Sequence, residues 1–273
     1  MKTHIKTYLS KAVTATAVAF PFILGAVTGH ANVFMFDAVH TTAAIYTGNN
    51  SPGHTSPYVD STNTDWRRIS SGSGAAVFGD LTINWNYGRS HNNALNAGVD
   101  FSLAKTNQAS TAAGPGVFST SLTGNYIRGR QDGDGRNVGF AFDGLPAGIY
   151  DVFVVLHNPD SLTSANNVGI GVLNEAPPTS SATALSWTDN RLTQVNLPAN
   201  PPTNAWVVNE NFALVQVTIT DPAQYLYVIG GAFGVSESAI SSIQIVAIPE
   251  PSTYAALFGL GALALIVLRR FRR

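Results

Sequence analysis

Apolar and polar residues alternate with a period of two through much of the middle of the chain. Residues 81–87, 138–142 and 213–220 each place an apolar side chain at every second position. Because successive side chains of a strand point to opposite faces of its sheet, each segment predicts a strand with one buried face. Residues 150–156 are apolar almost throughout, which predicts a central strand covered on both faces. Shorter apolar runs predict further strands at 33–36, 226–229 and 243–248.

Turn-forming residues separate these segments. The sequence Asp132-Gly133-Asp134-Gly135 predicts a hairpin that joins residues 126–130 to residues 138–142. Residues 143–148 predict the turn before the next strand, and turns that contain proline follow at 200–202 and 221–222. Residues 32–246, here called the body, show neither the apolar stripe of an amphipathic helix nor an internal repeat. Many short strands joined by such turns predict an all-β fold, either a sandwich or a barrel.

The C-terminal end follows a different pattern. An uncharged apolar run over residues 254–268 comes shortly after Pro249-Glu250-Pro251. It is followed by four arginines: Arg269, Arg270, Arg272 and Arg273. The two prolines lack amide donors and keep the backbone extended, the form that a processing enzyme binds most easily. With Ser252 and Thr253 the apolar run approaches the ~17–20 residues that cross a membrane, and the arginines favour a cytoplasmic end. We therefore predict a single transmembrane helix over residues 252–268.

The N-terminal end has the features of a signal peptide. Three lysines in the first eleven residues precede an apolar segment, residues 12–27, and small residues follow at Gly29 and Ala31. This order predicts an N-terminal signal helix that is cleaved between Ala31 and Asn32. An uncleaved N-terminal anchor is the alternative. The chain then divides into a signal peptide (1–31), an extracellular β domain (32–246) and a C-terminal tail (247–273).

The tail, with its Pro-Glu-Pro box, its span and its basic end in that order, resembles the PEP-CTERM sorting tail. The resemblance implies that an exosortase processes the protein, after the signal peptidase that the N-terminal residues predict. It also implies an exported protein that is first anchored in the inner membrane and then reaches the cell surface or extracellular matrix. Because exosortase systems are associated with exopolysaccharide production, the resemblance implies polysaccharide as the neighbouring material. A plain membrane anchor without processing is the alternative.

A second resemblance concerns the body. Residues 140–152 are similar to a strand–turn–strand of galactose-binding-like jelly rolls, and residues 240–246 resemble the last strand of such domains in PEP-CTERM proteins. This resemblance implies a jelly-roll-like β-sandwich. First and last strands are commonly neighbours in such folds, which would place residues 33–36 beside residues 243–246. The tail would then leave from one end of the sandwich.

Charge and composition limit the classes of partner and of chemistry that the protein could have. The 273 residues include 15 basic and 16 acidic ones, and seven of the basic and one of the acidic lie in the two end segments. The body therefore keeps eight basic and 15 acidic residues, a net charge of −7. An acidic body argues against nucleic acid as a partner. The chain has no cysteine, which excludes disulfides, thiol catalysis and metal sites with cysteine ligands.

The body offers few candidates for chemistry. Asp132, Asp134 and Asn137 could place three oxygen ligands around Ca²⁺, but Arg136 stands where a further oxygen would be needed. A plain hairpin turn is the favoured interpretation, and no other cofactor is expected. Trp66 and Trp187 lie in polar sequence contexts, which makes them the better candidates for exposed rings that stack on sugars. A place in the core is the alternative for each.

These observations favour a non-enzymatic envelope or matrix protein with a structural or polysaccharide-associated body. One alternative is a dedicated carbohydrate-binding module that loses affinity when Trp66 or Trp187 is replaced by alanine. A third hypothesis, less favoured, is a glycan-active hydrolase that uses two acidic residues.

Overall fold

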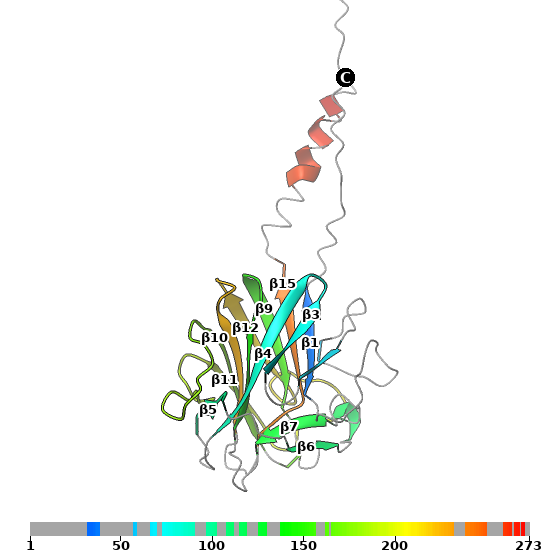
Figure 1. The fold of residues 1–273 in the computed structure, drawn as a ribbon. Helices are drawn as coiled ribbons and strands as arrows, with labels where there is room; N and C mark the ends of the chain where they lie inside the picture. The colour runs from blue at the N-terminus through cyan, green and yellow to red at the C-terminus, as the bar shows by residue number, and fades with distance from the viewer. Residues whose placement is uncertain are drawn as a thin grey trace, which may run out of the picture. The chain divides into compact units, whose positions relative to one another are not determined.

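The structure is a computed structural model, drawn in Figure 1. It describes residues 32–38, 57–58, 66–69, 73–90, 97–102, 108–111, 115–118, 125–129, 137–156, 162–163, 165–231, 238–249, 259–263, 265–267 and 269–270. The chain divides into two units, Met1–His30 and Ala31–Arg273, and every described residue belongs to the second. The predicted signal peptide, including Ala31, lies outside the described residues and stays a prediction.

One sheet has five strands in the order β12, β9, β15, β1, β2 (Figure 1). Its strands are β1 (Val33–Ala38), β2 (Trp66–Ile69), β9 (Gly148–Val155), β12 (Ala213–Ile219) and β15 (Ser242–Ile248). β1 and β15 are antiparallel neighbours, with Val33 opposite Val246 and Phe36 opposite Ile243. The predicted adjacency of the first and last strands is confirmed.

A second sheet has seven strands in the order β11, β10, β13, β8, β4, β3, with β5 paired to β4. Its strands are β3 (Ser73–Phe78), β4 (Leu81–Ser90), β5 (Val99–Asp100), β8 (Val138–Asp143), β10 (Asn166–Leu173), β11 (Thr193–Leu197) and β13 (Tyr225–Gly231). The two sheets pack face to face as an all-β sandwich, and their inner side chains form one core. The predicted fold class is confirmed.

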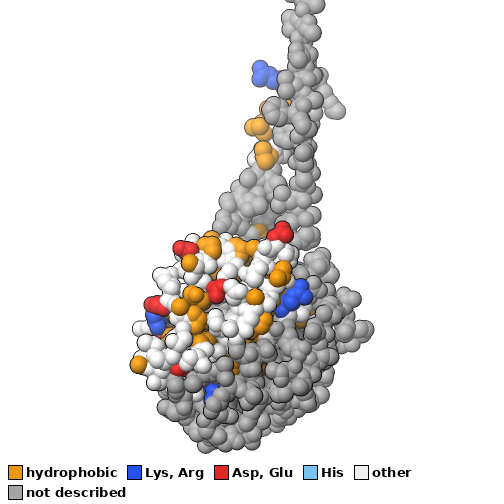
Figure 2. Space-filling model, in the orientation of Figure 1, with side chains coloured by type: hydrophobic (Ala, Val, Ile, Leu, Met, Phe, Trp, Pro, Cys, Tyr) orange, Lys and Arg blue, Asp and Glu red, His pale blue; other side chains and the backbone are white. Residues whose placement is uncertain are grey.

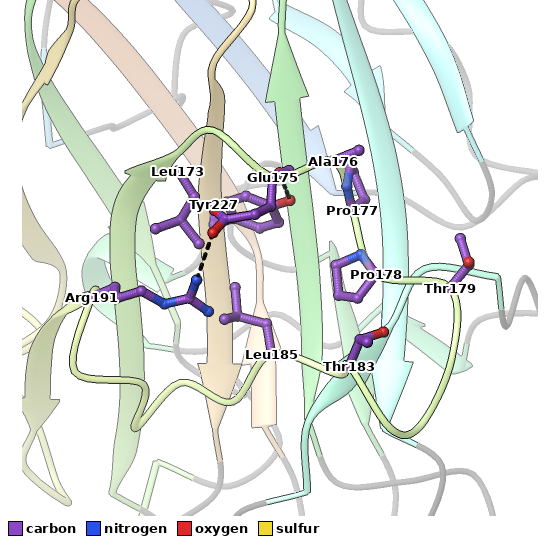
Figure 3. A pocket seen from close by; sticks show the side chains of 10 residues that line it. All are labelled: Leu173, Glu175, Ala176, Pro177, Pro178, Thr179, Thr183, Leu185, Arg191 and Tyr227. Carbon is purple, nitrogen blue, oxygen red and sulfur yellow. Dashed lines mark hydrogen bonds and ion pairs between the residues drawn. The ribbon is translucent and has the colours of Figure 1, made fainter.

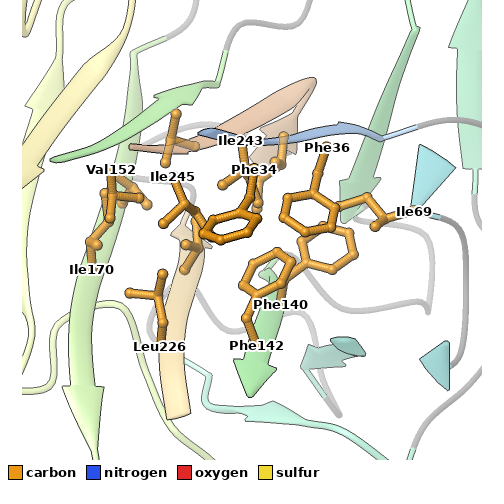
Figure 4. Packing of buried hydrophobic residues seen from close by; sticks show 14 of the residues in the cluster. Phe34, Phe36, Ile69, Phe140, Phe142, Val152, Ile170, Leu226, Ile243 and Ile245 are labelled. Carbon is orange, nitrogen blue, oxygen red and sulfur yellow. The ribbon is translucent and has the colours of Figure 1, made fainter. Parts of the chain in front are cut away.

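The core forms where the alternating segments predicted it. Phe34 and Phe36 of β1 meet Phe140 and Phe142 of β8 from the opposite sheet (Figure 4), and all four are at most 1% exposed. The Phe36 and Phe142 ring centroids lie 4.8 Å apart. Buried aromatic pairs of this kind stabilise a fold beyond the area that they bury, by about 0.5–1.5 kcal/mol each.

The predicted hairpin between residues 126–130 and 138–142 is wrong. The first of these segments forms β7 (Asn125–Gly129), which lies in a separate three-stranded sheet with β6 (Gln108–Thr111) and β14 (Ser238–Ile240). β8 has no free edge for β7, because β13 and β4 occupy its two sides. Alternation identifies a strand but does not choose its partner. A short 3₁₀ helix, η1 (Gly116–Phe118), comes between β6 and β7.

The turn after β8 carries the chain from one sheet to the other. Gly144 has φ +83°, and a Cβ there would collide with the carbonyl oxygen of Thr82. The Tyr150 hydroxyl donates to the Pro146 carbonyl oxygen at 2.7 Å, which ties the start of β9 to the turn. Burial raises the pKa of Tyr150 above its usual value. A tyrosine that bonds back to the preceding corner is a device of several β-sandwiches.

The prediction that the strand at 150–156 is covered on both faces is only partly right. β9 is an interior strand of its sheet, paired on both edges, and Val152 and Val154 point into the core. Asp151 and Phe153 point to the other face and are only half-buried. Gln216 stands opposite Asp151 on β12 and donates to its carboxylate at 3.3 Å, so this outer face is partly polar.

The described part of the tail is helical at residues 259–263, 265–267 and 269–270. Its large apolar side chains are exposed, from 45% at Val267 to 68% at Leu265. Within the described residues, no helix reaches the length and apolar character that crossing a membrane requires. Residues 252–258, 264 and 268 of the predicted span lie outside the described residues, so the span stays a prediction.

Candidate functional site

A long segment covers part of the outer face of the seven-stranded sheet. Residues 174–192, here called the cover segment, connect the neighbouring strands β10 and β11. The segment reaches as far as β5, where the amide of Val99 donates to the carbonyl of Leu185 at 2.8 Å. The amide of Phe101 donates to the carbonyl of Pro178, also at 2.8 Å. These bonds give the segment a fixed path over the sheet although it forms no strand of the sheet itself.

Trp187 anchors the cover segment. Its side chain is 4% exposed and packs in a second apolar cluster that includes Leu185, Leu192 and Tyr227. Gly231 of β13 provides the space, because a Cβ at that position would overlap the indole ring. Gly169 of β10 likewise lies against the Trp187 backbone. The hypothesis that Trp187 is an exposed ring is therefore wrong: in two neighbouring strands of one sheet, Gly231 leaves room for the ring and Gly169 for the backbone.

Trp66 is also buried, at 7% exposed, so the same hypothesis is wrong for it. It stands opposite Met35 in the parallel pair of β1 and β2. Its neighbours in a third apolar cluster include Val33, Met35 and Val246. Neither tryptophan presents an open ring face on which a sugar could stack.

A pocket of about 500 Å³ lies between the cover segment and the sheet (Figure 3). Leu173 and Tyr227 come from strands of the sheet, and the rest of the lining comes from the cover segment. The lining residues are Leu173, Glu175, Ala176, Pro177, Pro178, Thr179, Thr183, Leu185, Arg191 and Tyr227. The pocket lining therefore combines apolar side chains with three hydroxyl groups, those of Thr179, Thr183 and Tyr227, and one oppositely charged pair, Glu175 and Arg191.

Ion pairs fix the charged side of the pocket. Arg191 donates to both carboxylate oxygens of Asp189, at 2.9 and 3.0 Å, and to Glu175 at 3.2 Å. The hydrogen bond from Arg191 lowers the pKa of the Asp189 carboxyl, and the same bond raises the pKa of Arg191. Burial raises the pKa of Tyr227 far above its usual value, and its hydroxyl donates to the Glu175 carbonyl at 2.7 Å. At neutral pH Asp189 is thus ionised and Tyr227 is protonated.

The cover segment was not identified as a site from the sequence. Three strand glycines, Gly169, Gly171 and Gly231, are the sequence feature that could have indicated it. Glycine inside a strand weakens it and often marks a close approach by another part of the chain. Here Gly169 and Gly171 both lie against the end of the cover segment, near Leu192.

The candidate calcium turn is only partly described. Asn137 is fully buried, and its side-chain amide donates to the carbonyl of Ala97 while its backbone amide donates to the Ser90 hydroxyl. These contacts give Asn137 a packing role between two segments. Asp132 and Asp134 lie outside the described residues, so calcium binding there remains untested. Among the residues that the structure does describe, no three His, Asp or Glu side chains gather as a metal site.

The sorting box begins where the sandwich ends. Ile248, the last residue of β15, is still paired with Ile149 of β9. Ala247 donates its amide to the carbonyl of Asn32 at 2.9 Å. Pro249 follows outside the strand, as expected for a residue without an amide donor.

The other residues of the tail are described only in part. Arg269 and Arg270 are helical and exposed. Glu250, Pro251, Arg272 and Arg273 lie outside the described residues.

Several solved structures share local similarity with the chain. The isomalto-dextranase of Arthrobacter globiformis T6, complexed with panose, is 16% identical over 45% of this chain and 18% of its own, with a TM-score of 0.27. A β-glucuronidase of Bacteroides uniformis is 11% identical over 68% and 20%, with a TM-score of 0.30. The GH26-CBM35 β-(1,4)-mannanase of Podospora anserina is 12% identical over 66% and 29%, with a TM-score of 0.25. The chain thus spans less than a third of each of these proteins, and scores this low carry no argument about its fold or activity.

No curated protein matches the sequence. Residues 247–273, by contrast, match the family described as the PEP-CTERM protein-sorting motif. This match begins in the last two residues of β15 and includes the box, the apolar run and the arginines. The chain therefore carries a PEP-CTERM sorting tail, the mark of an exported protein that passes through a membrane-anchored intermediate and is processed by an exosortase.

Proposed function

We propose that the protein is a non-enzymatic structural component of the bacterial cell surface or extracellular matrix, delivered there by its two end segments. Signal peptidase removes residues 1–31, and the span over residues 252–268 holds the intermediate in the inner membrane. Exosortase then removes residues 254–273. The observation that carries the proposal is the sorting motif at residues 247–273, which follows a folded sandwich without a linker.

Exposure of the tail helix supports the membrane step. Leu260, Leu263 and Ile266 are 57–65% exposed. Leaving such side chains in water is unfavourable by about 25 cal/mol for each Å² of apolar surface, and a bilayer removes this penalty. The arginines that follow suit the cytoplasmic side of the membrane.

The surface and the pocket support a structural role for the body. On the face drawn in Figure 2, the few charged side chains of the described residues lie among uncharged polar and hydrophobic ones. Beside the pocket, Arg191 holds Asp189 ionised. A glycoside hydrolase needs one carboxyl with a raised pKa to act as a general acid, so Asp189 is a poor candidate for that role.

Fractionation of cells with and without the exosortase tests this function. In the host that has the enzyme, we expect the protein in the matrix fraction. In the host without the enzyme, we expect it in the inner membrane. If the protein is in the membrane fraction of both hosts, it is a simple anchored protein and the proposal is wrong.

Saccharide binding at the pocket is the second candidate function. A volume of about 500 Å³ lies within the usual range for small-molecule sites, and the hydroxyls of Thr179 and Thr183 beside an apolar interior suit a sugar. We would measure retention of the full processed protein on the host's own exopolysaccharide. The Thr183→Val variant should weaken retention, whereas Thr218→Ala, an exposed change on the other sheet, should not. Equal retention of both variants would exclude this pocket as the site.

A further inference from the structure

β12 is an unprotected edge of the five-stranded sheet. Within the described sheets it pairs with β9 alone, in a regular antiparallel register from Ala213 opposite Val154 to Ile219 opposite Gly148 (Figure 1). A regular register leaves no bulge, and the strand contains neither a proline nor a charged residue. Proteins commonly protect an edge strand with these three devices, because its unpaired N–H and C=O groups can bind another chain. β12 uses none of them.

The opposite edge of this sheet is protected by charge. Its strand, β2, has four residues, two of which are arginines. The Arg67 guanidinium donates to the Val77 carbonyl oxygen of β3, at 3.3 Å from Nε and 3.1 Å from Nη2. Its Cζ atom lies 5.3 Å from the centre of the Phe78 ring. Arg67 therefore joins the β2 edge to an edge strand of the other sheet, and a further chain would have to displace these contacts to pair there.

Side chains cap the outer edge of β12 at its two ends. The Leu214 amide donates to Oδ1 of Asn209 at 3.4 Å. Just past the strand, the Thr220 amide donates to Oε1 of Gln224 at 2.8 Å. Both bonds lie outside the ladder with β9, and alternate residues of a strand present their N–H and C=O groups to the same side. The even-numbered residues of β12 therefore face the open edge.

Gln216 and Thr218 lie between the two caps. Both residues are exposed, and within the described part of the chain no hydrogen bond reaches their backbone amides from the open side. Their open groups are placed evenly about Val217, whose side chain packs in the core. A strand with this arrangement is complementary to its own copy when the two strands run antiparallel, because each open amide then meets an open carbonyl.

We propose that β12 pairs edge to edge with β12 of a second copy of this chain, antiparallel about a two-fold axis at Val217. Gln216 of each copy then stands opposite Thr218 of the other, and each such pair exchanges two backbone hydrogen bonds. The two five-stranded sheets become one continuous sheet.

Charge and symmetry support a second copy as the occupant of this edge. The body is acidic, so two copies repel each other least where an uncharged strand faces its equivalent. Because Arg67 protects the opposite edge, pairing through β12 closes as a dimer and does not grow into a filament. This inference goes beyond the sorting function and does not depend on it.

Cross-linking of the full chain in detergent solution tests the register. The sequence has no cysteine, so one introduced cysteine is the only thiol. In the dimer the two Thr218 positions are two residues apart along the paired strands, about 7 Å, whereas the two Thr220 positions are six residues apart, about 20 Å. A thiol cross-linker with a reach between these values should link Thr218→Cys into dimers but not Thr220→Cys. Both positions are exposed threonines, so the two variants are matched.

Substitutions at Thr218 test the backbone hydrogen bonds. Thr218→Pro removes the outward amide and keeps the ladder with β9, because an edge strand tolerates proline where its N–H faces outward. The dimer then loses one hydrogen bond from each copy, so its dissociation constant should rise by roughly tenfold or more. Thr218→Ala keeps the amide and should dimerise like the wild type. Sedimentation equilibrium over a wide range of protein concentrations measures association.

A second disruptive variant covers the case in which proline disturbs the strand. Thr218→Lys leaves the backbone unchanged but places a charge from each copy beside the axis, so it should also weaken the dimer. Chemical denaturation of each variant checks that the sandwich has folded.

Three results would contradict the inference. A wild-type chain that stays monomeric at every concentration would show that the edge does not bind its own copy. If Thr218→Pro and Thr218→Lys both dimerise as well as the wild type, the contact lies elsewhere, for example in the apolar tail. Equal cross-linking of Thr218→Cys and Thr220→Cys would exclude the two-fold register at Val217.

Discussion

The cover segment and the sorting tail both combine apolar residues with charged or polar neighbours, but the two regions differ in how far their apolar side chains are exposed. In the cover segment, Trp187 lies in a polar stretch of sequence and is nevertheless buried at 4% exposure. In the tail, Leu265 lies in a continuous apolar run and is 68% exposed. Contacts with the folded sheet determine the burial of Trp187. The tail acts instead through the order of its residue types, which an enzyme can bind and a membrane can accommodate.

This difference shows what local sequence can establish about each region. The function of the tail depends on the order of the Pro-Glu-Pro box, the apolar span and the arginines. All three lie within residues 247–273, so local sequence is enough to identify them. The role of Trp187 depends on Gly169 and Gly231, which are far from it in the sequence and reach it only through strand pairing. The two regions should therefore respond differently to mutation.

The largest expected effect follows the loss of the anchor of the cover segment. Trp187→Ala removes a buried indole and leaves a cavity over the glycines, which should lower the free energy of unfolding by about 3–5 kcal/mol. Chemical denaturation of the full chain measures this change. Tail processing should be unaffected if the variant is still folded. A change below about 1 kcal/mol would mean that the ring contributes little to the packing of the cover segment.

The packing of the Trp187 ring against β13 can also be tested by a substitution at Gly231. Gly231→Ala should lower the free energy of unfolding by about 1–3 kcal/mol, because the new Cβ overlaps the Trp187 ring. In the Trp187→Ala background the same change should be much less costly. The two single variants and the double variant form a thermodynamic cycle. If the two changes in the free energy of unfolding were strictly additive, the cost of Gly231→Ala would not come from overlap with the Trp187 ring.

A smaller, pH-dependent effect is expected at the ion pair. The pKa of Asp189 is lowered in the folded protein, so its ionised form contributes stability above its unfolded pKa. That contribution is lost as the pH falls through the folded pKa. Arg191→Gln should therefore lower stability by less than about 1 kcal/mol at neutral pH, since Arg191 is largely exposed. The difference in stability between the two proteins should shrink as the pH falls through the lowered pKa of Asp189. A constant difference at all pH values would contradict this account.

The smallest effect on stability is expected in the tail. A chain that ends at Ile248 keeps all of β15 and should unfold with a free energy within about 0.5 kcal/mol of the full chain. The same truncation should abolish membrane association. Calorimetry and membrane flotation measure the two properties separately. A marked loss of stability would show that the tail packs on the sandwich.

Much of the fold could be predicted from the sequence because alternation marks strands with one buried face. The strands around Ile83, Phe140 and Val215 were found in this way, and the adjacency of β1 and β15 followed from the jelly-roll resemblance. The partner of β7 could not be predicted, because period-two patterns carry no information about which strands pair. The tail was identified in full, since each of its parts is a local feature of composition.

The candidate binding residues were harder to predict. A polar neighbourhood suggested exposure for Trp66 and Trp187, but burial depends on residues brought in by the sheets. Trp66 is buried because β1 pairs with its strand. Trp187 is buried because Gly231 has no side chain and so leaves room for the ring. The pocket beside Trp187 has the same origin, because its lining joins strand residues to the cover segment.

The central claim is that this is an exported protein with two processed ends, and intact mass measurement tests it most directly. The protein would be purified through an internal tag from a host that contains the exosortase. We predict a mature chain that begins at Asn32 and has lost residues 254–273. A mature chain that still ends at Arg273 would contradict exosortase processing and leave a simple membrane anchor.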